Sequence, residues 1–209
     1  MSAPGPVRAA TFRRLAAHER DDLLRHLLRL NAEDRRLRFG GHVGEEHLRA
    51  YCRHLDRYPG SIVLGCFVAG ELRGVGEFKP IEGAWPRAAE LAVSVEAPFR
   101  GGGIGTELCR RLLVRARNRF ITKLYMLCLP DNRPVRRIAS RLGGALAIYP
   151  GEVEARLAPT WPDPVSASEE WLDETAALLG PGSLPWAGFR SPWWSAPASL
   201  HLETSGEAR

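Results

Sequence analysis

The positions of apolar side chains along the chain predict short strands that alternate with amphipathic helices. Apolar or alternating runs of strand length cover residues 7–15, 62–68, 72–79, 88–95, 124–129, 145–149 and 153–158. Apolar residues three and four positions apart predict helices over residues 18–30, 45–55, 104–118 and 132–142. The stretch from Asn31 to Phe39 is interpreted only as a charged segment that ends at the Gly40-Gly41 break.

This order of elements predicts an α/β fold. The strand at 62–68 turns through Ala69-Gly70-Glu71 into the next strand, which is typical of an antiparallel hairpin. One mixed, mostly antiparallel sheet with helices on both faces is the packing that buries the apolar side of every element. We therefore expect one folded domain over residues 1–158.

The character of the chain changes after that point, where proline, serine and tryptophan become frequent. Ser166 and Glu169 have the spacing of a capping box, which predicts the start of a helix. The predicted helix carries an apolar stripe at Leu172, Ala176 and Leu179. The tail that follows holds Trp186, Trp193 and Trp194. We expect residues 159–209 to form an extension that packs on the domain or meets a partner.

Composition adds that the chain is an ordinary globular one. Its 209 residues are 44% hydrophobic and 25% charged, which excludes a disordered chain. The longest apolar stretch, residues 61–70, is about half of the roughly 20 residues that span a bilayer. No secretory signal is visible, and the four cysteines form no C-x-x-C pair and no zinc-ligand spacing. We expect a reduced, cytoplasmic protein with no membrane partner and no metal.

The formal net charge of +5 is only weak evidence for nucleic-acid binding. Lys79 and Lys123 are the only lysines, so 27 of the 29 basic residues are arginine. Residues 159–209 hold seven acidic and two basic residues, so the positive charge resides in residues 1–158. A basic domain attracts a phosphorylated cofactor as well as a polynucleotide, and no basic run is interleaved with aromatic residues. We expect no nucleic-acid partner.

A glycine-rich turn from Arg100 to Thr106 connects a strand to a helix. The first amides of a helix lack internal partners, and glycine lets the backbone approach an anion closely, so the turn predicts a phosphate or pyrophosphate site. A kinase-type P-loop is excluded because neither lysine follows a glycine. The dinucleotide fingerprint also fails, because its third glycine would fall on Thr106 or Leu108.

The spacing Arg100-x-x-Gly103-x-Gly105 resembles the pyrophosphate signature of the GNAT superfamily of N-acetyltransferases, and the order of elements over residues 6–158 is similar too. The resemblance implies that acetyl-CoA is the co-substrate and that Asn132 contacts its pantetheine or the site beside it. Main-chain amides near Val95 are the implied donors to the oxyanion. The cofactor-binding positions are then Val93, Val95, Arg100, Gly101, Gly102, Gly103, Ile104, Gly105, Thr106 and Asn132.

One departure concerns the acid that protonates the leaving thiolate. The family often has a tyrosine seven residues after the asparagine, but here that position is Ala139, followed by Ser140. The proton then comes from Ser140, from water or from no group at all. A coenzyme A thiol is acidic enough to leave as thiolate, so this change does not by itself abolish the chemistry.

The amine must lose a proton before it attacks, and two glutamates are candidates for the base. Glu90 is the first, because it opens the strand that leads to the glycine turn. Its surroundings resemble the Ala-Glu-x-Ala segment of the branch that acetylates protein lysines. The segments 33–39 and 151–154 are similar to that branch as well. Glu77 on the preceding strand is the second candidate. The six histidines are assigned surface or cap roles, and Cys128 a packing role.

The leading hypothesis is an N-acetyltransferase that moves an acetyl group from acetyl-CoA to a primary amine, on a small molecule or a protein lysine, by direct attack. The alternative is a non-catalytic, acyl-CoA-binding regulatory module, which Ala139 and the tryptophan-rich tail favour. A basic nucleic-acid-binding domain ranks below both. The acceptor, the acyl length and association into a homodimer stay open.

Overall fold

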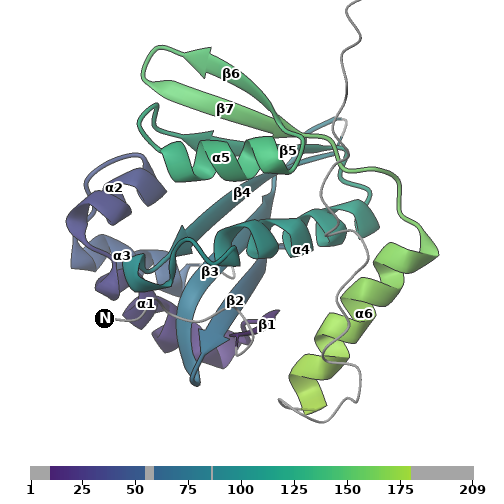
Figure 1. The fold of residues 1–209 in the computed structure, drawn as a ribbon, viewed down its shortest axis with the longest axis horizontal. Helices are drawn as coiled ribbons and strands as arrows, with labels where there is room; N and C mark the ends of the chain where they lie inside the picture. The colour runs from purple at the N-terminus through teal and green to yellow at the C-terminus, as the bar shows by residue number, and fades with distance from the viewer. Residues whose placement is uncertain (1–9, 55–58, 86, 180–209) are drawn as a thin grey trace, which may run out of the picture.

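The computed structural model describes residues 10–54, 59–85 and 87–179 (Figure 1). Seven strands form one sheet: β1 (Ala10–Arg14), β2 (Ile62–Val68), β3 (Glu71–Pro80), β4 (Ala88–Val95), β5 (Lys123–Cys128), β6 (Ala145–Tyr149) and β7 (Glu152–Leu157). Within the described ranges six α-helices accompany it: α1 (Arg20–Arg29), α2 (Ala32–Phe39), α3 (Glu45–Arg53), α4 (Ile104–Asn118), α5 (Arg133–Arg141) and α6 (Pro164–Leu179). The mixed α/β fold expected from the sequence is confirmed.

The strands lie in the order β1-β2-β3-β4-β5-β7-β6. All neighbours are antiparallel except β4 and β5, which are parallel and pair only from Ala88–Glu90 to Lys123–Tyr125. From there β4 continues to Val95 alongside β3 alone, while β5 continues alongside β7. The sheet is therefore divided at its centre, at the end of β4 that leads into the glycine turn.

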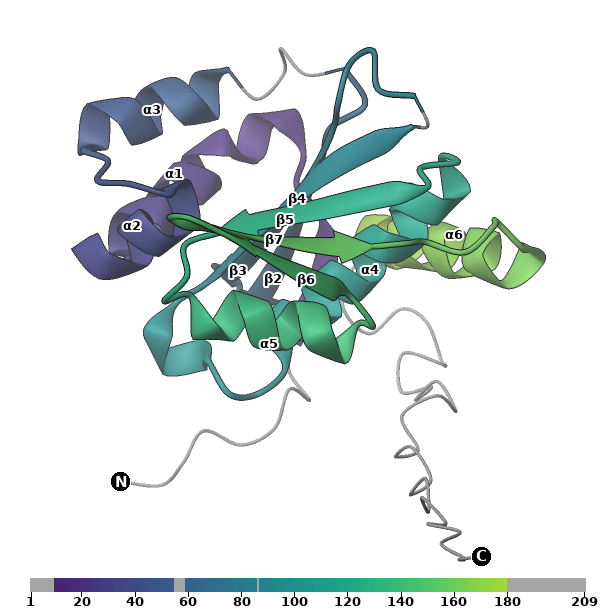
Figure 2. The same ribbon diagram turned by 90° about the horizontal axis from the view of Figure 1, so that it is seen from above.

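Helices cover both faces of the sheet (Figure 2). The helices α4, α5 and α6 lie on one face, where α4 contacts β2, β3 and β4 and α5 contacts β5, β6 and β7. The other face carries α1, α2 and α3, of which α1 contacts β3 and α2 contacts β4. No helix within the described ranges is both long and apolar enough to cross a membrane.

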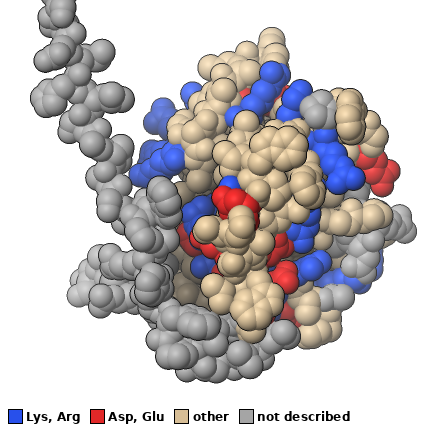
Figure 3. Space-filling model, turned by 90° about the vertical axis from the view of Figure 1, so that its right-hand side faces the viewer, with Lys and Arg blue, Asp and Glu red and all other residues tan. Residues whose placement is uncertain are grey.

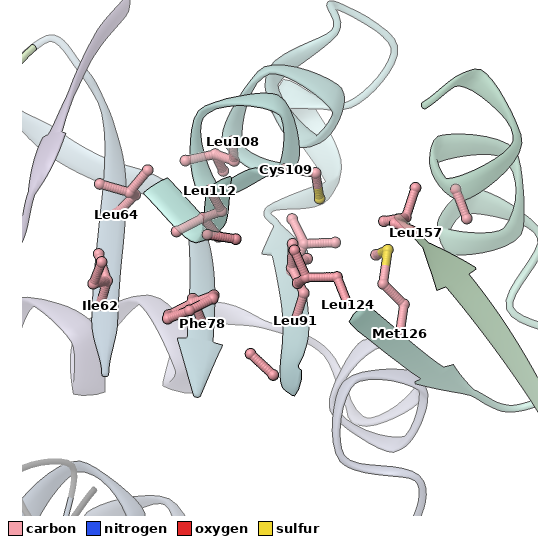
Figure 4. Packing of buried hydrophobic residues seen from close by; sticks show 14 of the residues in the cluster. Ile62, Leu64, Phe78, Leu91, Leu108, Cys109, Leu112, Leu124, Met126 and Leu157 are labelled. Carbon is pink, nitrogen blue, oxygen red and sulfur yellow. The ribbon is translucent and has the colours of Figure 1, made fainter. Parts of the chain in front are cut away.

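The larger core lies between α4 and the sheet. Leu108 and Leu112 of α4 point toward Leu64, Phe78 and Leu91 from three neighbouring strands (Figure 4). The helix approaches β3 closely because Gly76 has no side chain there, and a Cβ at this position would lie 2.9 Å from a methyl carbon of Leu112. This packing fixes the start of α4, and with it the glycine turn, against the end of β4.

The charged segment from Asn31 to Phe39 is in fact the helix α2, which the apolar spacing did not predict. The Asn31 side chain accepts a hydrogen bond from the Asp34 amide at 2.8 Å and caps the helix, and Gly40 ends it with a φ of 73°. None of its side chains is fully buried, so the helix has no apolar stripe to reveal it.

The start of α6 also differs from the expectation. Asp163, three residues before Ser166, is the capping residue: its carboxylate accepts from the Ser166 amide at 2.7 Å, and the Ser166 hydroxyl accepts from the Asp163 amide at 3.1 Å. Ion pairs then join α6 to α4, including Arg115 with Asp173 at 3.2 Å. The side chains of Ala176 and Leu179 and the three tail tryptophans lie outside the description, so the extension from residue 159 stays a prediction beyond α6.

Candidate functional site

A pocket of about 260 Å³ lies where β4 leaves β5. It is bounded by α2 on one side, by the glycine turn and the start of α4 on another, and by α5 on the third. Of the sequence-predicted residues it brings together Val93, Val95, Arg100, Gly101, Gly103, Ile104, Gly105, Thr106 and Asn132. Gly102 belongs to the same turn, although it is not among the described residues that line the pocket.

The turn has the backbone that an anion site requires. Gly101 and Gly103 have φ angles of 84° and 88°, in the left-handed region, and a Cβ on either would meet no protein atom within 4 Å. The first hydrogen bond of α4 runs from the Glu107 amide to the Gly103 carbonyl at 3.0 Å. The amides of residues 104–106 precede that bond and lie at the positive end of the helix dipole. The turn is thus an open cradle of main-chain donors.

Arg100 links this cradle to α2. Its Nε donates to the Val95 carbonyl at 2.9 Å, and its guanidinium forms an ion pair with Asp34 at 2.7 Å. The charged residues around the pocket are four arginines and one aspartate: Arg38, Arg100, Arg137, Arg141 and Asp34. The pocket therefore favours a ligand with several negative charges.

Asn132 begins α5 and is 4% exposed. Its side-chain oxygen accepts from the Val135 amide at 3.3 Å, and its side-chain nitrogen donates to the Leu37 carbonyl at 3.2 Å. The residue caps α5 and also connects that helix to α2 across the pocket. Ala139, two turns further on, is fully buried in the core, and Ser140 is exposed and outside the described pocket lining.

The two predicted bases lie on the face of the sheet that α1–α3 cover. Glu90 pairs with Lys79 and Ala92 pairs with Glu77 across β3 and β4, so Glu77, Lys79 and Glu90 share that face. Glu90 is exposed where β4 and β5 begin to part, opposite Tyr125. Neither glutamate is among the described residues that line the pocket.

Glu77 is only 2% exposed and is held by Arg38, which donates to it at 2.7 Å, and by the hydroxyl of Tyr51. Burial alone would raise the pKa of Glu77, but the charges of Arg38 and Lys79 and the two hydrogen bonds outweigh it and lower that pKa. Because Arg38 lines the pocket, Glu77 touches the site through this arginine.

One group of polar residues was missed from the sequence. His26 of α1 is fully buried, so the expected surface or cap role is wrong for it. Its Nε2 lies 2.9 Å from the hydroxyl of Ser94, and its Nδ1 lies 3.1 Å from a carboxylate oxygen of Glu96. Ser94 lines the pocket. These residues are about 70 positions apart in the chain, and no local pattern signals such a contact.

Among the described residues, the cysteines and the metal-ligating side chains form no second centre. All four cysteines are buried and free, and burial raises the pKa of the Cys128 thiol, which suits the packing role expected of it. Within the described residues no group of three or more histidine, cysteine, aspartate or glutamate side chains could hold a metal. On the face in Figure 3, basic side chains lie in separate groups among acidic and uncharged surface.

Solved structures place this fold among the GNAT N-acetyltransferases. The GNAT domain of S. lividans PAT is 18% identical with a TM-score of 0.61, over 70% of this chain and 89% of that one. An N-acetyltransferase from Staphylococcus aureus Mu50 is 16% identical with a TM-score of 0.59, over 72% and 99%. A putative acetyltransferase from Salmonella typhimurium, solved with its cofactor acetyl-CoA, is 19% identical with a TM-score of 0.54, over 73% and 95%.

The family itself follows from the sequence. The model of the acetyltransferase (GNAT) family matches residues 24–143, more than half of the chain, so this protein belongs to that family. The match begins within α1 and includes β4, the glycine turn, α4 and α5. No curated protein matches the sequence.

Proposed function

We propose that this protein binds acetyl-CoA in the pocket beside the glycine turn and transfers the acetyl group to a primary amine by direct attack. The observation that carries the proposal is the open turn at residues 101–106, in which two left-handed glycines leave main-chain amides free beside four arginines. A diphosphate matches such a cradle in charge and in its need for several donors.

The residues around the cradle fit the rest of the coenzyme. Arg100 and the amides of Gly101–Thr106 would hold the diphosphate, and Arg137 and Arg141 offer charge for a further phosphate. Val93 and Val95 lie on the part of β4 that no longer pairs with β5. The extended pantetheine arm can follow the main chain of the strand there. When bound, acetyl-CoA supplies an activated acyl group whose thiol leaves readily.

For the chemical step we propose Glu90 as the base that accepts the ammonium proton. It is exposed on the face opposite α4, so an amine can reach it from solvent. Glu77 is better suited to positioning, because Arg38 and Tyr51 already occupy its oxygens. Ser140 lies outside the described lining, so we assign it no step, and water protonates the thiolate.

The experiment is the release of free thiol from acetyl-CoA against a panel of small amines, lysine peptides and lysine-bearing proteins. Glu90→Gln should lower amine-dependent turnover by about 100-fold or more, the scale of general-base catalysis, with an unchanged Kd for acetyl-CoA. Glu46→Gln, an exposed glutamate on α3, is the matched control. Tight coenzyme binding with no turnover on any amine would contradict the enzyme proposal.

That last outcome would favour a non-catalytic, acyl-CoA-binding module. The observation behind this second candidate is Ala139, which is fully buried where the resemblance has a tyrosine acid. The panel also separates the two acceptor classes, since a protein-lysine enzyme would leave free small amines unmodified. A homodimer, which the sequence left open, can be tested in the same preparation by sedimentation.

A further inference from the structure

Three buried side chains next to the pocket form a continuous chain of hydrogen bonds. The hydroxyl of Ser94 lies 2.9 Å from Nε2 of His26, and Nδ1 of His26 lies 3.1 Å from Oε1 of Glu96. Their exposed fractions are 8%, 0% and 6%. A serine, a histidine and a carboxylate in this order have the geometry of a nucleophile, its base and the group that orients the base.

The protonation states follow from the neighbours. Glu96 also accepts from Arg29 and Arg73, each at 2.9 Å. Burial opposes the charge of Glu96, but these hydrogen bonds lower the pKa of its carboxyl, so it is ionised. Burial lowers the pKa of His26, so this imidazole is neutral at physiological pH. The only arrangement that satisfies all three groups has Nδ1 donating to Glu96 and Nε2 accepting from Ser94.

Of these three residues, only Ser94 is among those that line the coenzyme pocket. It lies between Val93 and Val95, on the stretch of β4 that β5 has left, and lines the same pocket as the glycine turn and Asn132. His26 closes it off from behind, from α1. Ser94 thus lines the pocket and is hydrogen-bonded to an unprotonated imidazole on α1.

We propose that Ser94 is a second acyl acceptor, which gives the protein an acyl-CoA hydrolase activity when no amine is present. The proposal rests on the coenzyme site described under the proposed function. The Ser94 oxygen bonds to the thioester carbon and its proton passes to Nε2 of His26. The carbon–sulfur bond breaks, and His26 returns the proton to the leaving sulfur, so free thiol departs and an ester remains on Ser94.

Water then completes the reaction. With His26 as base it adds to the ester carbon, the bond to the Ser94 oxygen breaks, and His26 gives the proton back to that oxygen. The sum is thioester plus water giving carboxylic acid plus thiol, with no other reactant. The first half also supplies a proton to the thiolate, which the buried Ala139 in place of a tyrosine cannot do.

The test uses the full chain with acetyl-CoA and no amine. We expect free thiol to be released and an acetyl group to be found, by mass spectrometry, on the peptide that contains Ser94. Ser94→Ala should lose the adduct and reduce thiol release to the buffer background. Ser168→Ala, an exposed serine on α6, should keep both. Ser94→Cys should keep the adduct but make it a thioester that neutral hydroxylamine cleaves.

Two readouts separate chemistry from a merely structural role. Thiol release by the native protein should rise with pH and level off once His26 is neutral, below the usual range for imidazole. His26→Gln, which can still hydrogen-bond to Ser94, should abolish this rise of thiol release with pH and reduce the maximal rate of release about 100-fold. Coenzyme Kd and the thermal midpoint of each variant are measured alongside, so that a misfolded variant is recognised.

The outcomes distinguish this inference from the proposed function. Amine-dependent turnover by the native protein supports the proposed function, and loss of the adduct and of the amine-independent thiol release in Ser94→Ala supports the hydrolase inference. If acetyl-CoA binds and amines are acetylated, but no acetyl adduct forms on Ser94 of the native protein, the hydrolase inference alone is overturned. Thiol release that is unchanged in Ser94→Ala overturns it as well. If acetyl-CoA does not bind the native protein, the proposed function fails and this inference fails with it.

Discussion

Replacing Gly103 by alanine is the sharpest probe of the glycine turn. The residue has a φ of 88° and precedes the first residue of α4. An alanine in the left-handed region costs about 1–2 kcal/mol, which lowers the thermal midpoint by roughly 2–8 °C for a domain of this size. Its Cβ would meet no protein atom within 4 Å, so no clash adds to this cost in the free protein.

Coenzyme binding should suffer more than stability. To relieve the strain, alanine pulls φ toward ordinary values and rotates the peptide plane that carries the next amide away from the bound phosphate. A hydrogen bond to a charged group contributes about 1.5–3 kcal/mol, so losing one raises Kd about 10- to 150-fold. Isothermal titration with acetyl-CoA measures the Kd, and thermal denaturation measures the stability.

Gly83→Ala provides the matched control. Gly83 has a φ of 70° in the connection between β3 and β4, likewise with no protein atom within 4 Å of an added Cβ, and it is outside the described pocket lining. It should show the same drop in thermal midpoint with an unchanged Kd. Equal Kd values for Gly103→Ala and the native protein would refute the assignment of this turn to the coenzyme.

Three further predictions concern the surroundings of the pocket. Glu77→Gln leaves a buried guanidinium without its counter-charge and should cost about 3–5 kcal/mol in urea denaturation at neutral pH. Folding lowers the pKa of Glu77, so its contribution to the free energy of unfolding is complete above the carboxyl pKa of the unfolded chain and is lost on acidification. The free energy of unfolding of the variant should therefore fall less steeply as the pH is lowered. Gly105→Ala would place a Cβ 3.0 Å from the Ile138 Cδ1 and should cost about 1 kcal/mol, which Ile138→Val restores in thermal denaturation. Asp34→Asn releases Arg100 and should tighten acetyl-CoA binding at most about fivefold by titration; weaker binding would contradict this.

The parts of the site that the sequence revealed are those built from consecutive residues. The strand ending at Val95, the glycines that follow and the apolar spacing of α4 are local signals, and the structure joins them as expected. Asn132 was named from the family resemblance, and in the structure it caps α5. Such features need no knowledge of tertiary contacts.

The parts that the sequence concealed depend on distant residues. His26 was assigned a surface or cap role with the other histidines, and only the packing of α1 on the sheet brings it to Ser94 and Glu96. Glu77 was the second candidate base, and nothing local in the sequence indicates its ion pair with Arg38. The helix α2 lacks an apolar stripe, so its caps were the only trace of it. Unlike the apolar periodicity of a helix or strand, ion pairs and hydrogen bonds between distant residues follow no regular spacing in the sequence.

The most direct test of coenzyme binding at the glycine turn is a crystal structure of the protein soaked with acetyl-CoA. We predict a diphosphate held by the main-chain amides of residues 101–106, with Arg100 turned from Asp34 toward it and the acyl end beside β4. A turn that stays empty, or that is filled by the protein's own side chains while the coenzyme lies elsewhere, would contradict it.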